Sequence, residues 1–217
     1  MSLLNNSNAI PTTGGDYNLE NSLRFRSSAS AYLSRTPATA GNRKTWTWSA
    51  WVKRGDLSGN PECYWGASEP GSATQLLFAS SGALTYFTGS TTINVITTQV
   101  FRDPSAWYHI VLTQDTTQAT AADRVKMYVN GEQVTSFTTA SYPSLNAEPY
   151  INSTELHTLG TQAQSGSPNT ARCVDGYLTE VNFVDGQALT PSDFGDTNEA
   201  TGVWQPAEYT GTYGTNG

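Results

Sequence analysis

The 217-residue chain has few cysteines and no long apolar run. Its two cysteines, Cys63 and Cys173, allow at most one disulfide, and the sequence leaves open whether they are bridged. No segment approaches the ~20 consecutive apolar residues that cross a bilayer, so we expect no membrane insertion. The first ten residues, MSLLNNSNAI, lack the basic and apolar regions of a secretory signal.

Charged residues are also scarce, at 13% of the chain, and the net charge is −7. This balance disfavours a broad basic surface, so we expect no nucleic-acid partner. Six tryptophans and eleven tyrosines argue against intrinsic disorder. The length suits one large domain that buries enough surface to fold without a disulfide or a metal.

The sequence shows the two-residue alternation of β-strands rather than helical periodicity. Residues 44–54, KTWTWSAWVKR, place Trp46, Trp48, Ala50 and Val52 on one face and Trp51 on the other. Residues 106–115 carry apolar side chains on both faces, which is typical of a central strand between stacked sheets. No helix of ten residues is predicted, and TPSDFGD (190–196) suggests only one helical turn.

Two turns divide these strands into hairpins. Asn130-Gly131 follows DRVKMYV, and an Asn-Gly pair between alternating segments is the strongest short-range hairpin signal. Ser81-Gly82 separates TQLLFAS from ALTYFTG in the same way. Many short strands with Gly-rich turns predict an all-β sandwich or barrel.

Three further segments, residues 58–73, 136–154 and 162–172, are interpreted as long loops. Tyr64 and Trp65 in the first and Tyr150 in the second are candidates for an aromatic sugar platform; alternatively, they cover the core edge or a subunit contact. His109 and His157 are interpreted as sheet residues rather than catalytic bases.

Residues 1–20 are polar and aperiodic and form a predicted N-terminal arm. Leu3, Leu4, Ile10 and Pro11 could anchor this arm on a neighbouring molecule. The alternative is a frayed terminus.

An ordered set of segments carries a family resemblance. The set is SLRFRSSASAYLSR, WTWSAWVKRG, AWYHIVLTQD, VKMYVNGEQV, LHTLGT and VDGYLTEVNFVDGQALTPSDFG. It resembles the laminin-G-like branch of the concanavalin A-like lectin and glucanase superfamily. The resemblance implies a jelly-roll sandwich of two antiparallel sheets over residues 21–196, with the Asn-Gly hairpin in the middle of the sandwich and a tail over 197–217.

The residues from Gly176 onward, and the start of the chain, resemble laminin-G-like modules in structural proteins of tailed bacteriophages. This resemblance implies a non-enzymatic virion protein, a fibre, spike or decoration module, with other virion proteins as partners and host-surface carbohydrate as a ligand. It also implies a homo-oligomer, with a trimer favoured, because phage fibres are most often trimers. The alternative function is a free carbohydrate-binding module or lectin.

A glucanase activity is disfavoured by the sequence. Retaining glucanases of this fold carry Glu-x-Asp-x-x-Glu on one strand, and here Asp175, Glu180 and Asp185 have spacings of five that alternate between faces. We expect no cofactor; Asp115, Asp123 and Asp175 are candidate ligands for Ca²⁺, which related domains bind through carboxylates. No spacing singles these three residues out.

Overall fold

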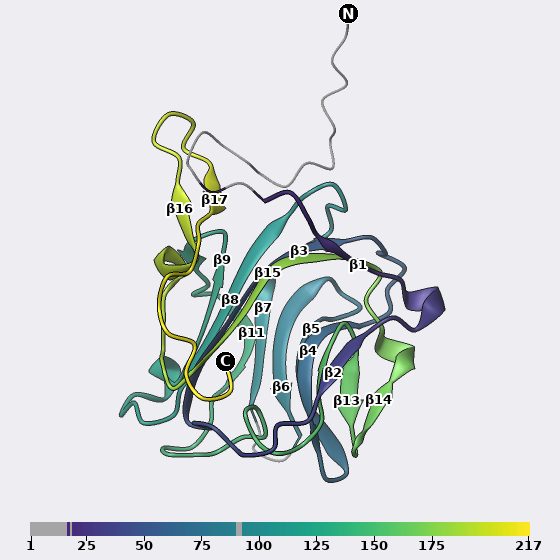
Figure 1. Ribbon diagram of the computed structural model, residues 1–217, viewed down its shortest axis with the longest axis vertical. Helices are drawn as coiled ribbons and strands as arrows, with labels where there is room; N and C mark the ends of the chain where they lie inside the picture. The colour runs from purple at the N-terminus through teal and green to yellow at the C-terminus, as the bar shows by residue number, and fades with distance from the viewer. Residues whose placement is uncertain (1–16, 18, 90–92) are drawn as a thin grey trace, which may run out of the picture.

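Two antiparallel sheets stack on each other and form the body of the protein (Figure 1). The computed structural model describes residues 17, 19–89 and 93–217. The proposed anchors Leu3, Leu4, Ile10 and Pro11 lie outside these residues. The arrangement confirms the predicted all-β jelly-roll sandwich.

The six-stranded sheet, called the β3 sheet below, has the order β1-β15-β3-β8-β9-β10. Its strands are β1 (Leu23–Phe25), β3 (Thr45–Arg54), β8 (Tyr108–Asp115), β9 (Val125–Val129), β10 (Glu132–Gln133) and β15 (Gly176–Asp185).

The seven-stranded sheet, called the β5 sheet, has the order β11-β7-β6-β5-β4-β12-β2. Its strands are β2 (Leu33–Arg35), β4 (Glu62–Glu69), β5 (Ser72–Phe78), β6 (Ala83–Thr88), β7 (Asn94–Val100), β11 (Phe137–Ser141) and β12 (His157–Leu159).

The remaining elements are short. Two small hairpins pair β13 (Gln162–Gln164) with β14 (Ser167–Asn169) and β16 (Gly195–Thr197) with β17 (Trp204–Pro206). The 3-10 turns are η1 (Ser27–Ala29), η2 (Ala121–Asp123), η3 (Thr170–Arg172) and η4 (Pro191–Asp193). The last of these is the predicted helical turn, with Thr190 as its cap and Pro191 in its first turn. No helix of the described residues is long and apolar enough to cross a membrane.

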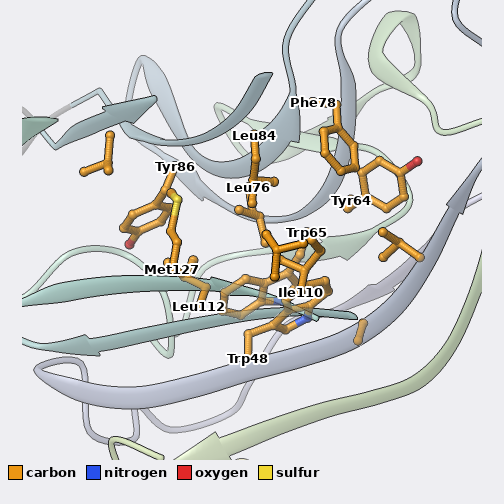
Figure 2. Packing of buried hydrophobic residues seen from close by; sticks show 14 of the residues in the cluster. Trp48, Tyr64, Trp65, Leu76, Phe78, Leu84, Tyr86, Ile110, Leu112 and Met127 are labelled. Atoms are coloured by element: carbon orange, nitrogen blue, oxygen red, sulfur yellow. The ribbon is translucent and has the colours of Figure 1, made fainter. Parts of the chain in front are cut away.

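The core lies between the two sheets and is rich in aromatic side chains (Figure 2). Trp46, Trp48, Ala50 and Val52 of β3 all point into it, as their alternation predicts. Each large aromatic side chain contributes 150–250 Å² of buried area, so this layer dominates the hydrophobic stabilisation. The predicted central strand β8 lies between β3 and β9.

The Asn130-Gly131 hairpin forms as predicted, with positive φ at both residues. Its position differs from the expectation, because β10 is a two-residue strand at the edge of the β3 sheet rather than in the middle. The ring of Trp204 packs on this turn, and a Cβ at Gly131 would lie 2.7 Å from it. Glycine is therefore required here by both conformation and space.

The three predicted loops contain regular structure, so that interpretation was wrong. Residues 58–73 include β4, whose eight residues are all buried. The β13–β14 hairpin from residues 162–172 contacts β4, so β4 is covered on both sides. Residues 136–154 include edge strand β11. Small and polar residues in these strands hide the alternation.

Both cysteines are free and buried. Burial raises the pKa of Cys63 to about 12, which keeps its thiol protonated and unreactive at neutral pH.

Candidate functional site

A cavity of about 520 Å³ opens at one edge of the sandwich, between the two sheets. Its walls come from β2 and β12 of the β5 sheet, from β15 of the β3 sheet, and from residues 213–217. These segments are far apart in the sequence, so no local sequence motif predicts the site.

The edge is open because β1 covers only part of β15. β1 pairs with β15 from Gly176 to Leu178 and then ends. A β-bulge follows between Thr179 and Asn182, with Glu180 at φ 49°. Beyond the bulge the Asp185 N–H donates to the Tyr213 carbonyl, so the last residues of the chain replace the missing strand.

The floor of the cavity is aromatic. Trp48 of β3 and Trp65 of β4 stack with ring centroids 5.8 Å apart, and Phe183 of β15 lies 5.4 Å from Trp65. Figure 2 shows the two tryptophans side by side at the centre of the packing. Both tryptophans are buried, so only a small part of each ring is accessible from the cavity.

The mouth carries exposed apolar side chains. Leu33 is 53% exposed, and Val181 and Tyr213 are each 39% exposed. Exposed apolar groups that gather at a concave site mark binding surfaces more often than isolated ones do. The bulge explains part of this arrangement, because it turns Val181 outward.

Polar groups surround the apolar surface. The Tyr213 hydroxyl donates to Asn182 Oδ1 at 2.7 Å, and Asn182 Nδ2 donates to the Glu180 carbonyl at 3.0 Å. Arg35 Nη1 donates to the Asn216 carbonyl at 3.0 Å. A few fixed polar groups on an apolar pocket are the usual means of orienting a small ligand.

His157 also lines the cavity, but both of its ring nitrogens are used. Nε2 accepts from the Asn152 N–H at 3.0 Å, so Nδ1 carries the proton that bonds the Glu155 carbonyl. Burial lowers the pKa of His157 to about 4, and the neighbouring Arg35 acts in the same direction. His157 is therefore a neutral structural residue at physiological pH, as the sequence predicted.

A buried carboxylate, Asp185, holds the cavity wall in place. It accepts hydrogen bonds from the Asn42 N–H, from Asn152 Nδ2 and from the Asn216 N–H, at 2.8, 2.7 and 3.2 Å. Such bonds stabilise a charge that burial would otherwise disfavour. A Cβ on Gly41 would lie 2.3 Å from this carboxylate, so only glycine allows the approach.

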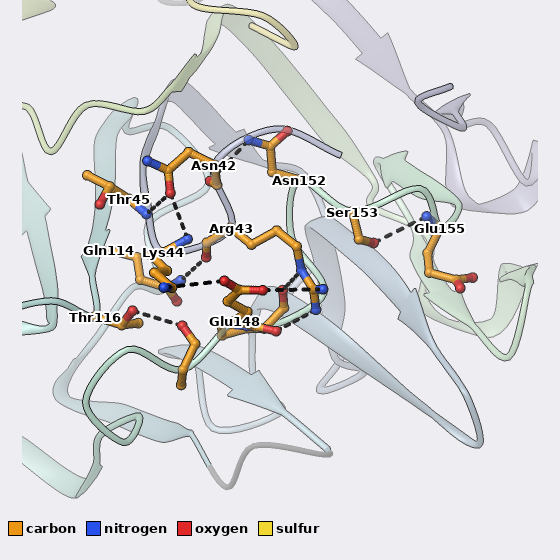
Figure 3. A network of polar contacts seen from close by, with 12 residues as sticks. Asn42, Arg43, Lys44, Thr45, Gln114, Thr116, Glu148, Asn152, Ser153 and Glu155 are labelled. Carbon is orange, nitrogen blue, oxygen red and sulfur yellow. Dashed lines mark hydrogen bonds and ion pairs between the residues drawn. The ribbon is translucent and has the colours of Figure 1, made fainter. Parts of the chain in front are cut away.

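Amide side chains extend the network from Asp185. Asn152 Nδ2 also donates to the Asn42 carbonyl (Figure 3). Asn216 Nδ2 donates to the Thr39 carbonyl and to Asn152 Oδ1, at 2.9 and 3.0 Å. Asn216 is thereby fixed on both its backbone and its side chain, and its carbonyl can hold Arg35.

The predicted sugar platform is only partly present in the structure. Trp65 lines the cavity, but Tyr64 packs edge-on against Phe78 in the core, with centroids 5.3 Å apart. Tyr150 lies under the guanidinium of Arg43 instead. Sequence reasoning missed the residues that join Trp65, namely Trp48, Phe183 and Tyr213, because it placed Trp65 on a loop.

The candidate metal ligands do not converge. Asp115 pairs with Thr45 at one end of β3, whereas Asp175 precedes Gly176, which pairs with Arg54 at the other end. Asp175 forms an ion pair with Arg24, and Asp123 forms one with Lys126. No group of three potential ligands occurs in the described ranges. These aspartates do not fit a shared Ca²⁺ site.

The carboxylates considered for glycosidase chemistry are also separate. The bulge on β15 falls at Glu180 and breaks the alternation of faces there. Glu180 contacts the hydroxyl of Tyr17, whose pKa is raised by burial and by this hydrogen bond. Asp185 is enclosed by amides and Asp175 faces Arg24.

His109 lies 2.9 Å from Ser49 but is not its base. The Trp204 Nε1–H donates to His109 Nδ1, so the ring proton is on Nε2 and points to the Ser49 hydroxyl. The ring is sandwiched between Trp51 and Trp204. His109 is a satisfied sheet residue, as predicted.

Residues 27–193 match the family model of the concanavalin A-like lectin/glucanases superfamily, in its laminin G form. The chain belongs to this family. No curated protein sequence matches it.

Solved structures show the same fold at low identity. The chain resembles the native heptameric SAP-like pentraxin of Limulus polyphemus (TM-score 0.52, 14% identity, 73% of this chain and 71% of that one). It also resembles domains LG4-5 of the mouse laminin α1 chain (TM-score 0.55, 12% identity, 88% and 48%), of which it spans about half. The third is the CBM40 module of a Ruminococcus gnavus IT-sialidase (TM-score 0.50, 12% identity, 74% and 95%).

Proposed function

We propose that this laminin-G-like domain is a non-enzymatic carbohydrate-binding module whose ligand site is the edge cavity. The observation that carries the proposal is the aromatic floor of Trp48, Trp65 and Phe183 beneath a rim of fixed amide, hydroxyl and guanidinium groups. A sugar has an apolar C–H surface and a set of hydroxyls. It therefore matches a cavity with one apolar side and polar groups around it.

The size of the cavity supports a small ligand. Its volume of about 520 Å³ lies within the ~300–1,000 Å³ of ordinary small-molecule sites. The mouth is open to solvent through Leu33 and Val181, so a terminal sugar of a longer glycan can enter while the rest of the chain stays outside.

The arrangement of carboxylates supports binding rather than hydrolysis. A retaining glycosidase needs two carboxyl groups about 5–5.5 Å apart across the scissile bond. In the described residues, Asp175, Glu180 and Asp185 each interact with a different partner. We expect the purified domain to leave laminarin and other β-glucans intact.

The biological setting we propose is a tailed-phage virion. The support is the resemblance of the segment from Gly176 onward, and of the chain start, to phage structural modules. In that setting the protein is a homo-oligomeric fibre, spike or decoration module, with three copies favoured, that touches host-surface glycans beside other virion proteins. Repetition of a weak sugar contact would raise avidity. Detection of the chain on purified intact particles tests this setting independently of sugar binding.

A matched pair of variants tests the cavity as the sugar site. Leu33 and Leu145 are both leucines and both 53% exposed, but only Leu33 lines the cavity. Leu33→Glu removes an apolar contact with the sugar equal to about half of a fully buried leucine. The lost binding free energy is ~1 kcal/mol, so sugar binding should weaken about fivefold. Leu145→Glu, with the same charge change, should bind like the wild type.

The measurement is a glycan panel followed by tryptophan fluorescence titration, because Trp48 and Trp65 lie in the cavity floor. A panel without any binder would refute carbohydrate binding. Equal loss in both variants would place the site elsewhere on the protein.

A further inference from the structure

The edge cavity has few charged side chains among its described lining residues. The chain has 18 acidic and 11 basic residues. The described residues that line the cavity nevertheless include no aspartate or glutamate, and they include one arginine, Arg35. Arg35 is therefore the charged side chain among the described residues that line the cavity.

Arg35 is held so that part of its guanidinium stays available. Its Nη1 donates to the Asn216 carbonyl at 3.0 Å, and this carbonyl is fixed by the amide network around Asp185. The bond orients the planar group and uses one of its five N–H donors. The guanidinium can still present a pair of donors to a carboxylate, the geometry that arginine favours.

The neighbouring side chains use their polar atoms on partners other than Arg35. His157, paired with Arg35 across β12 and β2, has both ring nitrogens engaged. Asp185, the acid in the amide network, accepts with both oxygens from amide N–H donors. Arg35 takes part in none of the ion pairs found among the described residues.

We propose that the cavity selects sugars that carry a carboxylate, with Arg35 as the residue that determines this specificity. The sugar ring rests on the aromatic floor and its carboxylate pairs with the Arg35 guanidinium. This inference rests on the proposed carbohydrate-binding function and adds the class of sugar. A terminal uronic acid and a sialic-type sugar both present this chemistry.

The test compares acidic sugars with their neutral counterparts. Methyl glucuronide and methyl glucoside differ only in the carboxylate at C6, and methyl sialoside can be compared with its methyl ester. The wild type should bind at least one acid more than tenfold tighter than its neutral partner. The pair of sugars for which the acid binds more tightly identifies whether a uronic acid or a sialic-type sugar is the ligand.

Arg35→Gln should abolish the preference, so that this variant binds the acid and its neutral partner with equal affinity. Arg35→Lys should retain part of the preference for the acid, because the positive charge stays but the pair of parallel N–H donors is lost. Arg26→Gln is the matched control, since Arg26 is also exposed but does not line the cavity. Raising the salt concentration from 0.05 to 0.5 M should weaken the binding of the acidic sugar but not that of the neutral sugar.

The outcomes separate the two proposals. Equal binding of acid and neutral sugar by the wild type, or a preference that survives in Arg35→Gln, would overturn the role of Arg35 and leave the module intact as a sugar binder. Absence of binding to every sugar would overturn both.

Discussion

Two aromatic clusters lie on opposite sides of β3, and one is closed while the other is open. Trp51 points outward. His109 stacks on Trp51 with ring centroids 5.0 Å apart, and Trp204 stacks on His109 with centroids 5.9 Å apart. Trp48 points inward and stacks on Trp65, yet the space beside this pair opens to solvent at Leu33 and Val181.

The difference comes from what the C-terminal residues do on each side. On the outer face, the β16–β17 hairpin places Trp204 over the sheet, and its indole N–H bonds His109. At the edge, residues 213–217 bond to β15 but form only one wall of the cavity. Cover by a segment distant in the sequence, and not aromatic content, decides which cluster is accessible to solvent.

The largest expected effect comes from opening the closed cluster. Trp204→Ala removes the ring that packs on the Asn130-Gly131 turn and on Gly195. It also leaves His109 Nδ1 without its donor. We expect the free energy of unfolding to fall by about 3 kcal/mol.

Urea denaturation measures this loss, and Val203→Ala is its control, because Val203 is adjacent and 48% exposed. A loss below ~1 kcal/mol would show that the hairpin does not stabilise the outer face. Sugar binding at the edge cavity should remain in the folded variant, since the two clusters lie on opposite faces.

The next effect is an acid sensitivity of the closed cluster. Burial lowers the pKa of His109 from 6.5 to about 3, so the unfolded chain takes up protons first as the pH falls. The stabilisation is complete above pH ~6.5 and is lost between there and pH ~3. At pH 5 the loss from His109 is about 2 kcal/mol.

Denaturation at pH 7 and pH 5 checks this sign. His109→Gln should be less stable at pH 7 but should lose less on acidification. Part of the dependence should remain in this variant, because the pKa of His157 is also lowered by burial. An unchanged pH dependence in His109→Gln would show that other groups cause the acid sensitivity.

The sequence predicts the parts of this comparison that depend on local pattern. Alternation alone assigns Trp48 to the core and Trp51 to the opposite face, and Asn130-Gly131 gives the hairpin. It also assigns His109 to a satisfied sheet position. These features depend only on residues that are neighbours in the sequence, so a single sequence is enough to predict them.

The cavity depends on contacts that no local pattern encodes. Leu33, Trp65, Val181 and Tyr213 come from four separate segments. The bulge at Glu180 puts a non-glycine residue at positive φ, and alternation predicts the wrong face there. Trp65 was recognised as a candidate, but its partners follow from topology alone.

The smallest expected change in stability concerns the N-terminal arm, which enters the described structure beside the open cluster. Tyr17 contacts Glu180 at the bulge, and the Asn21 carbonyl accepts from the Thr179 hydroxyl at 2.8 Å. Deleting residues 1–16 keeps both contacts, so the thermal midpoint should change by less than about 1 °C. If Leu3, Leu4, Ile10 and Pro11 anchor the chain on a neighbour, the same deletion should abolish the oligomer measured by light scattering. Deleting residues 1–21 is the comparison, because it also removes the contacts to Glu180 and Thr179 and should lower the thermal midpoint.

A trimer that survives the deletion of residues 1–16 would assign assembly to the sandwich itself. A large fall in the thermal midpoint of that same variant would make the arm part of the fold.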